Sequence, residues 1–461
     1  MNKQVFSGDK GIIDYLRPDI DNYSPLVELP PELNPYYEEY GIHLYVKLLN
    51  TLPLANVKSL PAWSMLEHAP KRVQGINIVE SSSGNTVFSI GILAKSFGVN
   101  KVKAVASRDV TQGKLNLLKI AGIDVQLVDG PLCPSPNDPR SSITIAKKIG
   151  KQPGWYNPGQ YDNDFNPQAH REYTGPQIYT QLDGNVALFV AGLGTTGTLL
   201  GTSEYLRSVS KTVRIAGVVR APNNAVPGVR TKNGLDEVAF GWQDVLTDAL
   251  VTVNERESFE KSLAMIRHGL LVGPSTGFAY AGALKQLELM KQAKDLEQLR
   301  GGNIVFVAPD TMFPYVDEYL SVLDVSYFGK IDDQTTTSST MEATNEIAAI
   351  AELSVEDVYN DYSSGGGVLS SQHYKLVDVR NEVEFQDHHI PGSINIPFEV
   401  VDQWLNEQKL LKPIVFVCRR GVTSLRAAQI AKEHDIEAYS MLGGTTEWSA
   451  KQLPRILSNY C

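Results

Sequence analysis

The sequence predicts an α/β protein in which a large region with doubly wound parallel sheets precedes a smaller α/β domain. Short apolar runs alternate with amphipathic stretches up to about residue 330, and a shorter series of the same kind begins near residue 351. Between them, residues 332–345 (DDQTTTSSTMEATN) are polar, rich in Ser and Thr, and without an apolar period. We therefore expect a first domain over residues 1–330, a linker over 331–350 and a second domain over 351–461.

Five apolar runs of the first region are typical of buried parallel strands. They are residues 75–80 (GINIVE), 101–107 (KVKAVAS), 186–194 (VALFVAGLG), 212–219 (TVRIAGVV) and 303–309 (NIVFVAP). Amphipathic stretches at 87–98 and 111–122 predict helices, each ending at a glycine, as helices commonly do. Strands that alternate with helices in this way predict βαβ units and a parallel sheet.

The second region repeats this alternation on a smaller scale. The pattern predicts helices over 354–362, 400–408 and 424–434, and strands over 375–380 and 413–418.

Composition limits the classes of function. A hydrophobic content of 42%, a charged content of 20% and a net charge of -10 are ordinary for a soluble protein and indicate neither nucleic acid nor a membrane as partner. No apolar stretch is long enough to span a bilayer, and the first residues lack the apolar core of a signal peptide. Cys133, Cys418 and Cys461 are too few for a disulfide framework, so we expect a reducing, cytoplasmic setting. The eight histidines show no metal-ligand spacing, and we expect no metal.

Three short loops of small and hydroxyl residues follow one another in the first region: residues 82–86 (SSGNT), 192–198 (GLGTTGT) and 273–277 (GPSTG). The first lies between a strand and a helix, where backbone N–H groups can bind an anion, here a carboxylate. The second lets the backbone approach a phosphate, although its spacing is not that of a dinucleotide or P-loop site. The third could point a hydroxyl into the same cleft. Each loop alone is more often structural than functional.

The order and spacing of the three loops resemble fold-type II pyridoxal-phosphate (PLP) enzymes, the family of cysteine synthase and cystathionine β-synthase. Residues 24–27 (SPLV) stand where the family has TPLV. Residues 166–170 (NPQAH) and 174–176 (TGP) match its NP..H..TTGP segment. The resemblance implies the two-lobed fold of this family, a homodimer, and PLP as the cofactor.

The same resemblance selects one lysine. Residues 45–62 (YVKLLNTLPLANVKSLPA) align with the family's YVK.E..NP.GSVKDR.A, so Lys58 occupies the Schiff-base position. A lysine without this flanking pattern would be read as a surface residue. PLP enzymes use such a lysine to bind the cofactor aldehyde covalently and to act as acid and base.

By the same alignment, the resemblance implies a role for each loop. Asn85 would hydrogen-bond the ring hydroxyl of the cofactor. Ser275 would face its pyridine nitrogen, and a neutral hydroxyl there would temper the electron sink and favour β-elimination and replacement over transamination. The residues expected to bind the cofactor phosphate are Gly194, Thr195, Thr196, Gly197 and Thr198. Those expected to bind the substrate carboxylate are Ser82, Ser83, Thr86 and Gln160.

Some positions depart from the family pattern. Residues 59–60 (SL) replace the usual Asp-Arg, and Thr196 stands where Gly is usual. Residues 227–233 (PGVRTKN) lack the flexible glycines of acetylserine-using enzymes. Arg230 and Lys232 could instead face an anionic substrate group, although either alone is more often a solvated loop charge. The leaving group and the nucleophile therefore stay open.

The second region resembles a rhodanese. Residues 375–397 (KLVDVRNEVEFQDHHIPGSINIP) follow its signature D.R...EF..GHIPGA.NIP, with His388 where Gly is common, and residues 442–448 (LGGTTEW) match its late LGG...W segment. Residues 418–424 (CRRGVTS) then resemble the active-site loop, in which a cysteine begins a turn above a helix N-terminus. Such surroundings lower the pKa of a thiol and can stabilise a persulfide.

We expect Cys418 to be catalytic together with Lys58, although a free cysteine is commonly buried and inert. Thr423 stands where the family's second arginine is common, so we expect thiosulfate to be a poor sulfur donor.

The two resemblances together predict a cysteine synthase-like transferase. It would carry out PLP-dependent β-replacement on an activated L-serine, with the sulfur handled as a persulfide on Cys418. The partners implied are a small amino-acid substrate and a sulfide or persulfide donor, which could be a sulfur-carrying protein. Two alternatives stay open: a cysteine lyase or desulfhydrase that passes sulfur to Cys418, and a rhodanese module with only a docking role.

Overall fold

The computed structural model describes residues 5–69, 73–108, 110–128, 138–222, 224–329, 351–363, 373–407 and 412–457. The chain divides into two compact units, Met1–Gly329 and Lys330–Cys461. The linker expected over 331–350 lies outside the described residues, as do Cys133 and Cys461.

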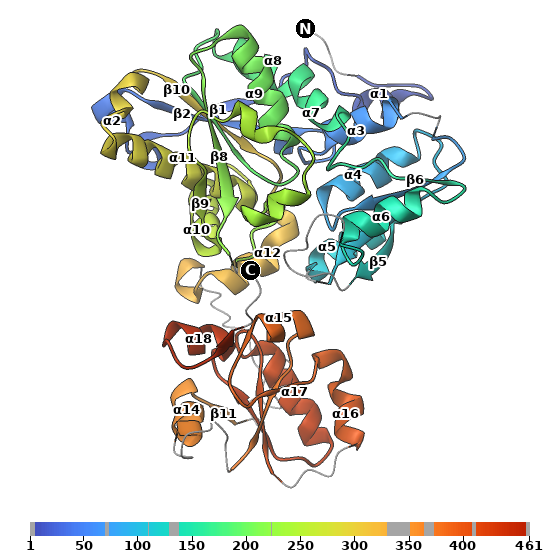
Figure 1. The fold of residues 1–461 in the computed structure, drawn as a ribbon, viewed down its shortest axis with the longest axis vertical. Helices are drawn as coiled ribbons and strands as arrows, with labels where there is room; N and C mark the ends of the chain where they lie inside the picture. The colour runs from blue at the N-terminus through green and yellow to red at the C-terminus, as the bar shows by residue number, and fades with distance from the viewer. Residues whose placement is uncertain are drawn as a thin grey trace. The chain divides into compact units, whose positions relative to one another are not determined.

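A six-stranded sheet forms the larger lobe of the first unit (Figure 1). Its order is β1 (Leu26–Glu28), β2 (His43–Leu48), β10 (Asn303–Ala308), β7 (Leu188–Gly192), β8 (Arg214–Arg220) and β9 (Val251–Val253), and only the β1–β2 pair is antiparallel. Helices α10 (Glu255–Arg267) and α11 (Pro274–Gln292) pack on one face, and α8 (Gly175–Gln181) and α9 (Gly197–Val209) on the other. The apolar strands are buried on both faces because helices cover both.

The smaller lobe contains a four-stranded parallel sheet. Its order is β5 (Asp124–Val128), β4 (Lys101–Ser107), β3 (Asn77–Ser81) and β6 (Trp155–Tyr156). Helices α3 (Ser59–Glu67), α4 (Asn85–Ala94) and α5 (Gln112–Ile120) lie on one side of the core, and α6 (Ser142–Gly150) on the other. The doubly wound, two-lobed fold predicted from the sequence is therefore confirmed, and the seven predicted elements correspond to β3, β4, β7, β8, β10, α4 and α5.

Two further helices of the first unit lie near the site. They are α7 (Phe165–Ala169), followed by a π-helical turn over His170–Thr174, and α12 (Val316–Val322). A π-helical turn is rare and often marks a functional position.

The second unit is a smaller parallel α/β domain. Its five-stranded sheet has the order β11 (Glu352–Leu353), β16 (Ala438–Met441), β15 (Ile414–Val417), β12 (Lys375–Asp378) and β14 (Ile394–Asn395). A short antiparallel pair joins β13 (His388–His389) and β17 (Ile456–Leu457). The helices are α14 (Val355–Ser363), α15 (Glu382–Asp387), α16 (Val401–Glu407), α17 (Val422–Glu433) and α18 (Gly444–Ala450). The small α/β domain expected here is confirmed, with β12 and β15 at the two predicted strands. Across the part of the chain that is described, no helix is long and apolar enough to cross a membrane.

Candidate active sites

Lys58 lies immediately before α3 and opens onto a cavity of about 370 Å³ between the loops of the two lobes. Among the described residues, the Lys58 ammonium has no hydrogen-bond partner. Burial lowers the pKa of Lys58 to about 8, an effect opposed by the negative charge of Asp310. At pH 7 roughly a tenth of this lysine is therefore uncharged, far more than for an ordinary lysine, and can act as a nucleophile or base.

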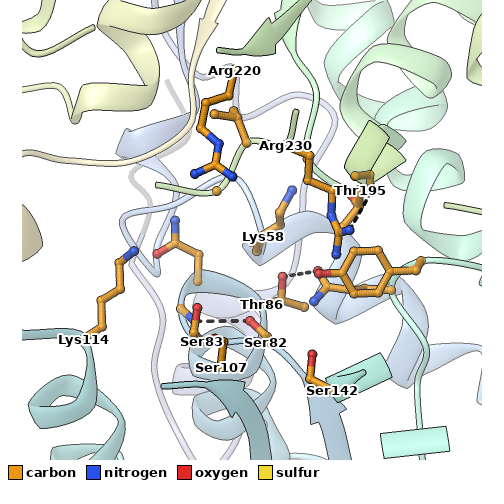
Figure 2. Close-up of a pocket in the computed structure, with 18 of the residues that line it drawn as sticks. Lys58, Ser82, Ser83, Thr86, Ser107, Lys114, Ser142, Thr195, Arg220 and Arg230 are labelled. Carbon is orange, nitrogen blue, oxygen red and sulfur yellow. Dashed lines mark hydrogen bonds between the residues drawn. The ribbon is translucent and has the colours of Figure 1, made fainter. Parts of the chain in front are cut away.

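The loop after β3 supplies the hydroxyl side of the cavity. Ser82, Ser83 and Thr86 line it, and Figure 2 shows the two serines on the side of Lys58 opposite Arg220. Thr86 Oγ1 donates to Gln160 Oε1 at 2.5 Å, and Gln160 Nε2 donates to the Ser81 carbonyl at 2.7 Å. The four residues expected to bind a carboxylate are thus brought to one wall, at the N-terminus of α4.

A buried carboxyl holds this wall in place. Glu80 Oε2 accepts a hydrogen bond from the backbone N–H of Gly159 at 2.8 Å, next to Gln160. Burial raises the pKa of Glu80 to about 8. Glu80 therefore ties strand β3 to the segment that carries Gln160.

The loop between β7 and α9 is tightly packed and strained. Thr196 has a φ of 67°, a left-handed conformation that glycine adopts more easily, in keeping with the family's usual Gly at this position. A Cβ on Gly194 would lie 2.2 Å from the Gly228 carbonyl oxygen, so only glycine fits there. Gly197 packs against Asn166, where a Cβ would lie 2.3 Å from Oδ1.

Seven residues expected to bind the cofactor line a second, smaller cavity of about 70 Å³ that shares Lys58 with the first. These are Lys58, Asn85, Gly194, Thr195, Thr196, Thr198 and Ser275. Gly197 is the expected cofactor residue that does not line this cavity. The two spaces adjoin and share Lys58, Asn85, Gly194 and Thr195, whereas the four residues expected to bind the substrate carboxylate line the larger one alone.

The smaller cavity also contains a residue that the sequence analysis missed. Asp310, the first residue after Pro309 at the end of β10, accepts hydrogen bonds from Asn85, Ser275 and Tyr315. An aspartate that follows a buried parallel strand at its carboxyl end is a recognisable signal for a site residue. Sequence could not show which side chains this aspartate meets.

His170 contacts the loop between β7 and α9, which is expected to bind the cofactor phosphate. Its ring nitrogens contact Thr174 Oγ1 at 2.9 Å and Thr198 Oγ1 at 3.1 Å. Burial and, to a smaller extent, the charge of Lys58 lower the pKa of His170 to about 3. The ring is therefore neutral at physiological pH and positions Thr198 without adding charge.

Arg230 and Lys232 differ in placement. Arg230 lines the larger cavity, where its guanidinium lies 4.8 Å from the centroid of the Tyr161 ring and donates to the Gly234 carbonyl at 2.6 Å. Lys232 is exposed and is not among the residues that line this cavity. Of the two cations that the sequence could not distinguish, the structure brings Arg230 to the site.

The second unit presents Cys418 at the end of β15. The thiol is 4% exposed, and its Sγ accepts a hydrogen bond from the Gly421 backbone N–H at 3.1 Å. Ser424 Oγ lies 3.3 Å from the same sulfur, within the first turn of α17. Gly421 has a φ of 99°, which lets the loop curl around the sulfur. The sulfur therefore lies in a turn at the N-terminus of α17, with one backbone N–H and one hydroxyl beside it.

The polar residues of the predicted rhodanese signature make buried contacts around β12. Arg380 makes a buried ion pair with Asp378 at 2.6 Å and donates to the His388 carbonyl at 2.7 Å. Asn395 donates to the backbone carbonyls of both Asp378 and Arg380. These residues fix the edge of the sheet beside β12.

Two family models match the chain. The one described as pyridoxal-phosphate dependent enzyme matches residues 21–310, more than half of the chain, and the one described as rhodanese-like domain matches residues 366–451. The chain belongs to the family of pyridoxal-phosphate dependent enzymes. It carries a rhodanese-like domain at its C-terminal end.

Within this PLP family, the chain is similar to cysteine synthases. It is 30% identical to cysteine synthase B of Salmonella typhimurium over 267 residues, covering 57% of this chain and 84% of the relative. It is 26% identical to cysteine synthase of Staphylococcus aureus over 318 residues, covering 66% of this chain and 98% of the relative.

Solved structures share the fold of this PLP enzyme. O-ureido-L-serine synthase is 25% identical, with a TM-score of 0.55 and coverage of 67% of this chain and 95% of that one. A hydrogen sulfide-producing enzyme of Fusobacterium nucleatum is 24% identical, with a TM-score of 0.55 and coverage of 66% of this chain and 97% of that one.

The residues at the smaller cavity fit PLP. The Thr196 hydroxyl is buried without a hydrogen-bond partner among the described residues, so it is available to donate to a phosphate oxygen. Gly194 leaves no room for a side chain, so a phosphate can approach the loop backbone closely. The Lys58 ammonium is buried and meets no hydrogen-bond acceptor in the part of the chain that is described, so its amine is open to an aldehyde.

Proposed function

We propose that this PLP enzyme catalyses β-replacement on an activated L-serine at Lys58, and that Cys418 carries the sulfur as a persulfide. The observation that carries the proposal is the position of Lys58 between two adjoining spaces. One is lined by the tight glycine and threonine loop, and the other by Ser82, Ser83 and Gln160. Such a site holds a cofactor and an amino-acid carboxylate on either side of one base.

Each group has a task in this proposal. Ser82, Ser83, Thr86 and Gln160 bind the substrate carboxylate, and Gly194 to Thr198 bind the cofactor phosphate. PLP, when bound, supplies the electron sink for bond breaking at the substrate Cα. Lys58 Nζ removes the α-proton and later returns a proton to Cα.

In the proposed reaction, the bond from Cβ to the leaving group is replaced by a C–S bond. The leaving group departs from Cβ with its bonding electrons, and hydrosulfide forms the new C–S bond at Cβ. Hydrosulfide is released from the Cys418 persulfide when two thiols supply two electrons and become a disulfide. The net products are cysteine, the leaving group, the Cys418 thiol and that disulfide.

Arg230 favours a substrate whose leaving group is already negatively charged while it is attached to Cβ. Its guanidinium lies over Tyr161, which follows Gln160 on the carboxylate side of the cavity. A planar guanidinium suits a phosphate or carboxylate better than a neutral acetyl group. We therefore propose a phosphoserine-like substrate in preference to acetylserine.

The experiment supplies phosphoserine, acetylserine or cysteine to wild type and to Cys418→Ser, with free sulfide or with a small persulfide and a thiol reductant. We expect both proteins to form cysteine equally well from phosphoserine and free sulfide. With the persulfide donor, only wild type should form cysteine efficiently. Equal rates with the persulfide would leave the rhodanese-like domain a docking role. Sulfide release from cysteine that exceeds cysteine formation would identify a lyase instead.

A further inference from the structure

Glu80, near the end of β3, has a buried side chain beside the wall that is expected to bind the substrate carboxylate. It is 1% exposed and is not among the residues that line the larger cavity. Oε1 accepts a hydrogen bond from the Ser81 N–H at 3.0 Å, and Oε2 accepts from the Gly159 N–H at 2.8 Å. The carboxyl therefore holds backbone on both sides of the contact between β3 and the segment that carries Gln160.

The side chain of Gln160 is held in one orientation by neighbours of Glu80. Gln160 Nε2 donates one hydrogen to the Ser81 carbonyl at 2.7 Å, and Gln160 Oε1 accepts the single hydroxyl hydrogen of Thr86 at 2.5 Å. In this arrangement Thr86 can only accept from a substrate, whereas the second Nε2 hydrogen of Gln160 is available to a carboxylate. The Gln160 carbonyl accepts from Asn166 Nδ2 at 2.7 Å, which fixes its backbone as well.

The orientation of Gln160 depends on the two residues whose N–H groups Glu80 binds. Ser81 supplies the carbonyl that Gln160 Nε2 uses, and Gly159 precedes Gln160 in the chain. Without the Glu80 carboxyl, both N–H groups would be buried without this acceptor. Because such groups are costly to leave unpaired, the backbone would move to satisfy them and would turn the Gln160 amide away.

Burial also controls the charge of Glu80. It raises the pKa of Glu80 to about 8, although backbone N–H groups oppose the rise, and the negative charge of Asp162 adds to it. Among the described residues, the Tyr156 hydroxyl also interacts electrostatically with Glu80, and Asp162 is itself paired with Lys147 Nζ at 2.7 Å. At pH 7 about nine-tenths of Glu80 is therefore uncharged.

A substrate carboxylate at this wall would meet an uncharged Glu80 well below pH 8 and a charged one well above it. Two carboxylates in one buried region repel each other, because little solvent screens them. The affinity for a carboxylate should therefore fall as the pH rises through 8. By the same linkage, a bound carboxylate should raise the pKa of Glu80 further.

We propose that Glu80 is a positioning residue for the substrate carboxylate, which orients the Gln160 amide through the N–H groups of Ser81 and Gly159. The inference rests on the proposed function, in which Gln160 binds that carboxylate. Glu80 acts through Gln160 and does not itself line the cavity. It therefore governs the affinity for amino acids with a free carboxylate and has little effect on the chemical step.

L-Alanine and L-alaninamide test this, because they differ at the carboxylate and neither carries a leaving group. Each is titrated into the loaded holoenzyme, and the absorbance of the bound cofactor reports its dissociation constant. At pH 7, Glu80→Ala should weaken L-alanine binding about tenfold, as expected for a hydrogen bond to a charged group, and L-alaninamide binding less than about twofold. Glu80→Gln keeps the shape and an acceptor for Gly159, so it should stay close to wild type.

The pH profile separates positioning from general support of the fold. As the pH rises from about 7 to 9, wild type should lose affinity for L-alanine severalfold relative to Glu80→Gln, which cannot ionise. The comparison of the two proteins removes the titration of the ligand amine, since it is the same for both. With phosphoserine, Glu80→Ala should raise KM about tenfold and leave kcat nearly unchanged. Glu172→Ala, which removes an exposed carboxylate of the same unit, is the control.

The outcomes are distinguishable. Equal losses for the two ligands in Glu80→Ala would overturn the inference, because the carboxyl would then support the site in general. Coinciding pH profiles of wild type and Glu80→Gln would overturn it too, and this comparison needs no alanine variant. Wild type in which borohydride never fixes PLP on Lys58 would overturn the proposed function and the inference with it. L-Alanine binding that follows Glu80 in a protein without phosphoserine turnover would support the inference and contradict the proposed reaction alone.

Discussion

The Lys58 site and the Cys418 loop each present one reactive side chain, but they are built at different scales. Around Lys58, contacts join distant parts of the chain, such as Asn85 and Asp310, which are 225 residues apart. Around Cys418, the contacts to sulfur come from Gly421 and Ser424, three and six residues away. The first site depends on how two lobes pack, whereas the second depends on the curl of one loop and on the segment after β16 that donates to it.

The two reactive groups also differ in their polar contacts. Burial lowers the pKa of Lys58 to about 8, because a desolvated ammonium is unfavourable, and among the described residues its ammonium has no hydrogen-bond partner. The Cys418 sulfur instead accepts a hydrogen bond from the Gly421 backbone N–H. If the sites are independent in this way, a change that disables one should leave the chemistry of the other in place.

The largest expected effect follows removal of the lysine. Lys58→Ala should lower cysteine formation by about three orders of magnitude or more, since covalent attachment and proton transfer are lost together. Borohydride should no longer fix PLP to the chain. Persulfide formation on Cys418, followed by intact mass, should be unchanged. Lys232→Ala, which changes an exposed lysine, is the control, and an active Lys58→Ala variant would contradict the proposal.

Removal of the thiol should give the reciprocal result. Cys418→Ser should form no persulfide after donor treatment, because the sulfur that holds it is missing. Cysteine formation from persulfide should fall at least about tenfold, the ratio expected if general thiol exchange is the only remaining route. Cys461→Ser serves as the control, and a persulfide mass retained in Cys418→Ser would show that another cysteine carries the sulfur.

A matched pair of glycine substitutions tests whether the sites are independent. A Cβ on Gly194 would lie 2.2 Å from the Gly228 carbonyl oxygen, and one on Gly444 would lie 2.2 Å from the Cys418 carbonyl oxygen. Gly194→Ala should weaken PLP binding by about 1–3 kcal/mol, roughly fivefold to 150-fold, through overpacking. Gly444→Ala should impair persulfide formation to a similar degree. Cofactor titration and intact mass should each respond to one variant alone, and a response to both would mean that the sites are coupled.

Reconstitution with PLP should depend on pH through Lys58. Only the neutral amine attacks an aldehyde, so with a pKa of about 8 the rate of binding to apo-protein should rise with pH and level off above 8. Below that value the rate should fall about tenfold per pH unit, following the neutral fraction. Stopped-flow absorbance measures it. A rate that climbs without levelling up to the ordinary lysine pKa would mean that burial does not tune Lys58.

The smallest effect concerns the sulfur donor. Thr423→Arg restores a cation at a position next to Ser424 and should raise persulfide formation from thiosulfate a few fold, in line with about 1 kcal/mol for a partly exposed charge pair. The rate with a neutral persulfide should not change. Thr423→Gln, which is polar but uncharged, is the control. An equal gain for Gln would attribute the effect to side-chain length.

Much of the fold was predictable because its signals are local. Buried strands such as β7 and β10 have continuous apolar runs, and helices α4 and α5 are each followed by a glycine of positive φ, so the doubly wound pattern is visible along the chain. Lys58 and Cys418 could be selected for the same reason, since each stands within a flanking motif of a few residues. The contacts to the Cys418 sulfur come from its own loop, but the Cys418 carbonyl accepts from the Thr445 N–H at 2.9 Å, a contact that the loop sequence alone does not show.

The partners of Asp310 and the difference between Arg230 and Lys232 were decided by tertiary structure alone. Neighbouring cations in one loop have equivalent sequence signals, and only the packing of the loop brings Arg230 to the cavity. The position of Asp310 after a buried strand is a local signal, but its hydrogen-bond partners are set only when α4, α11 and the segment before α12 meet at the end of β10. Electrostatic surroundings are sums over groups that are close in space, whereas a sequence pattern reports only groups that are close along the chain.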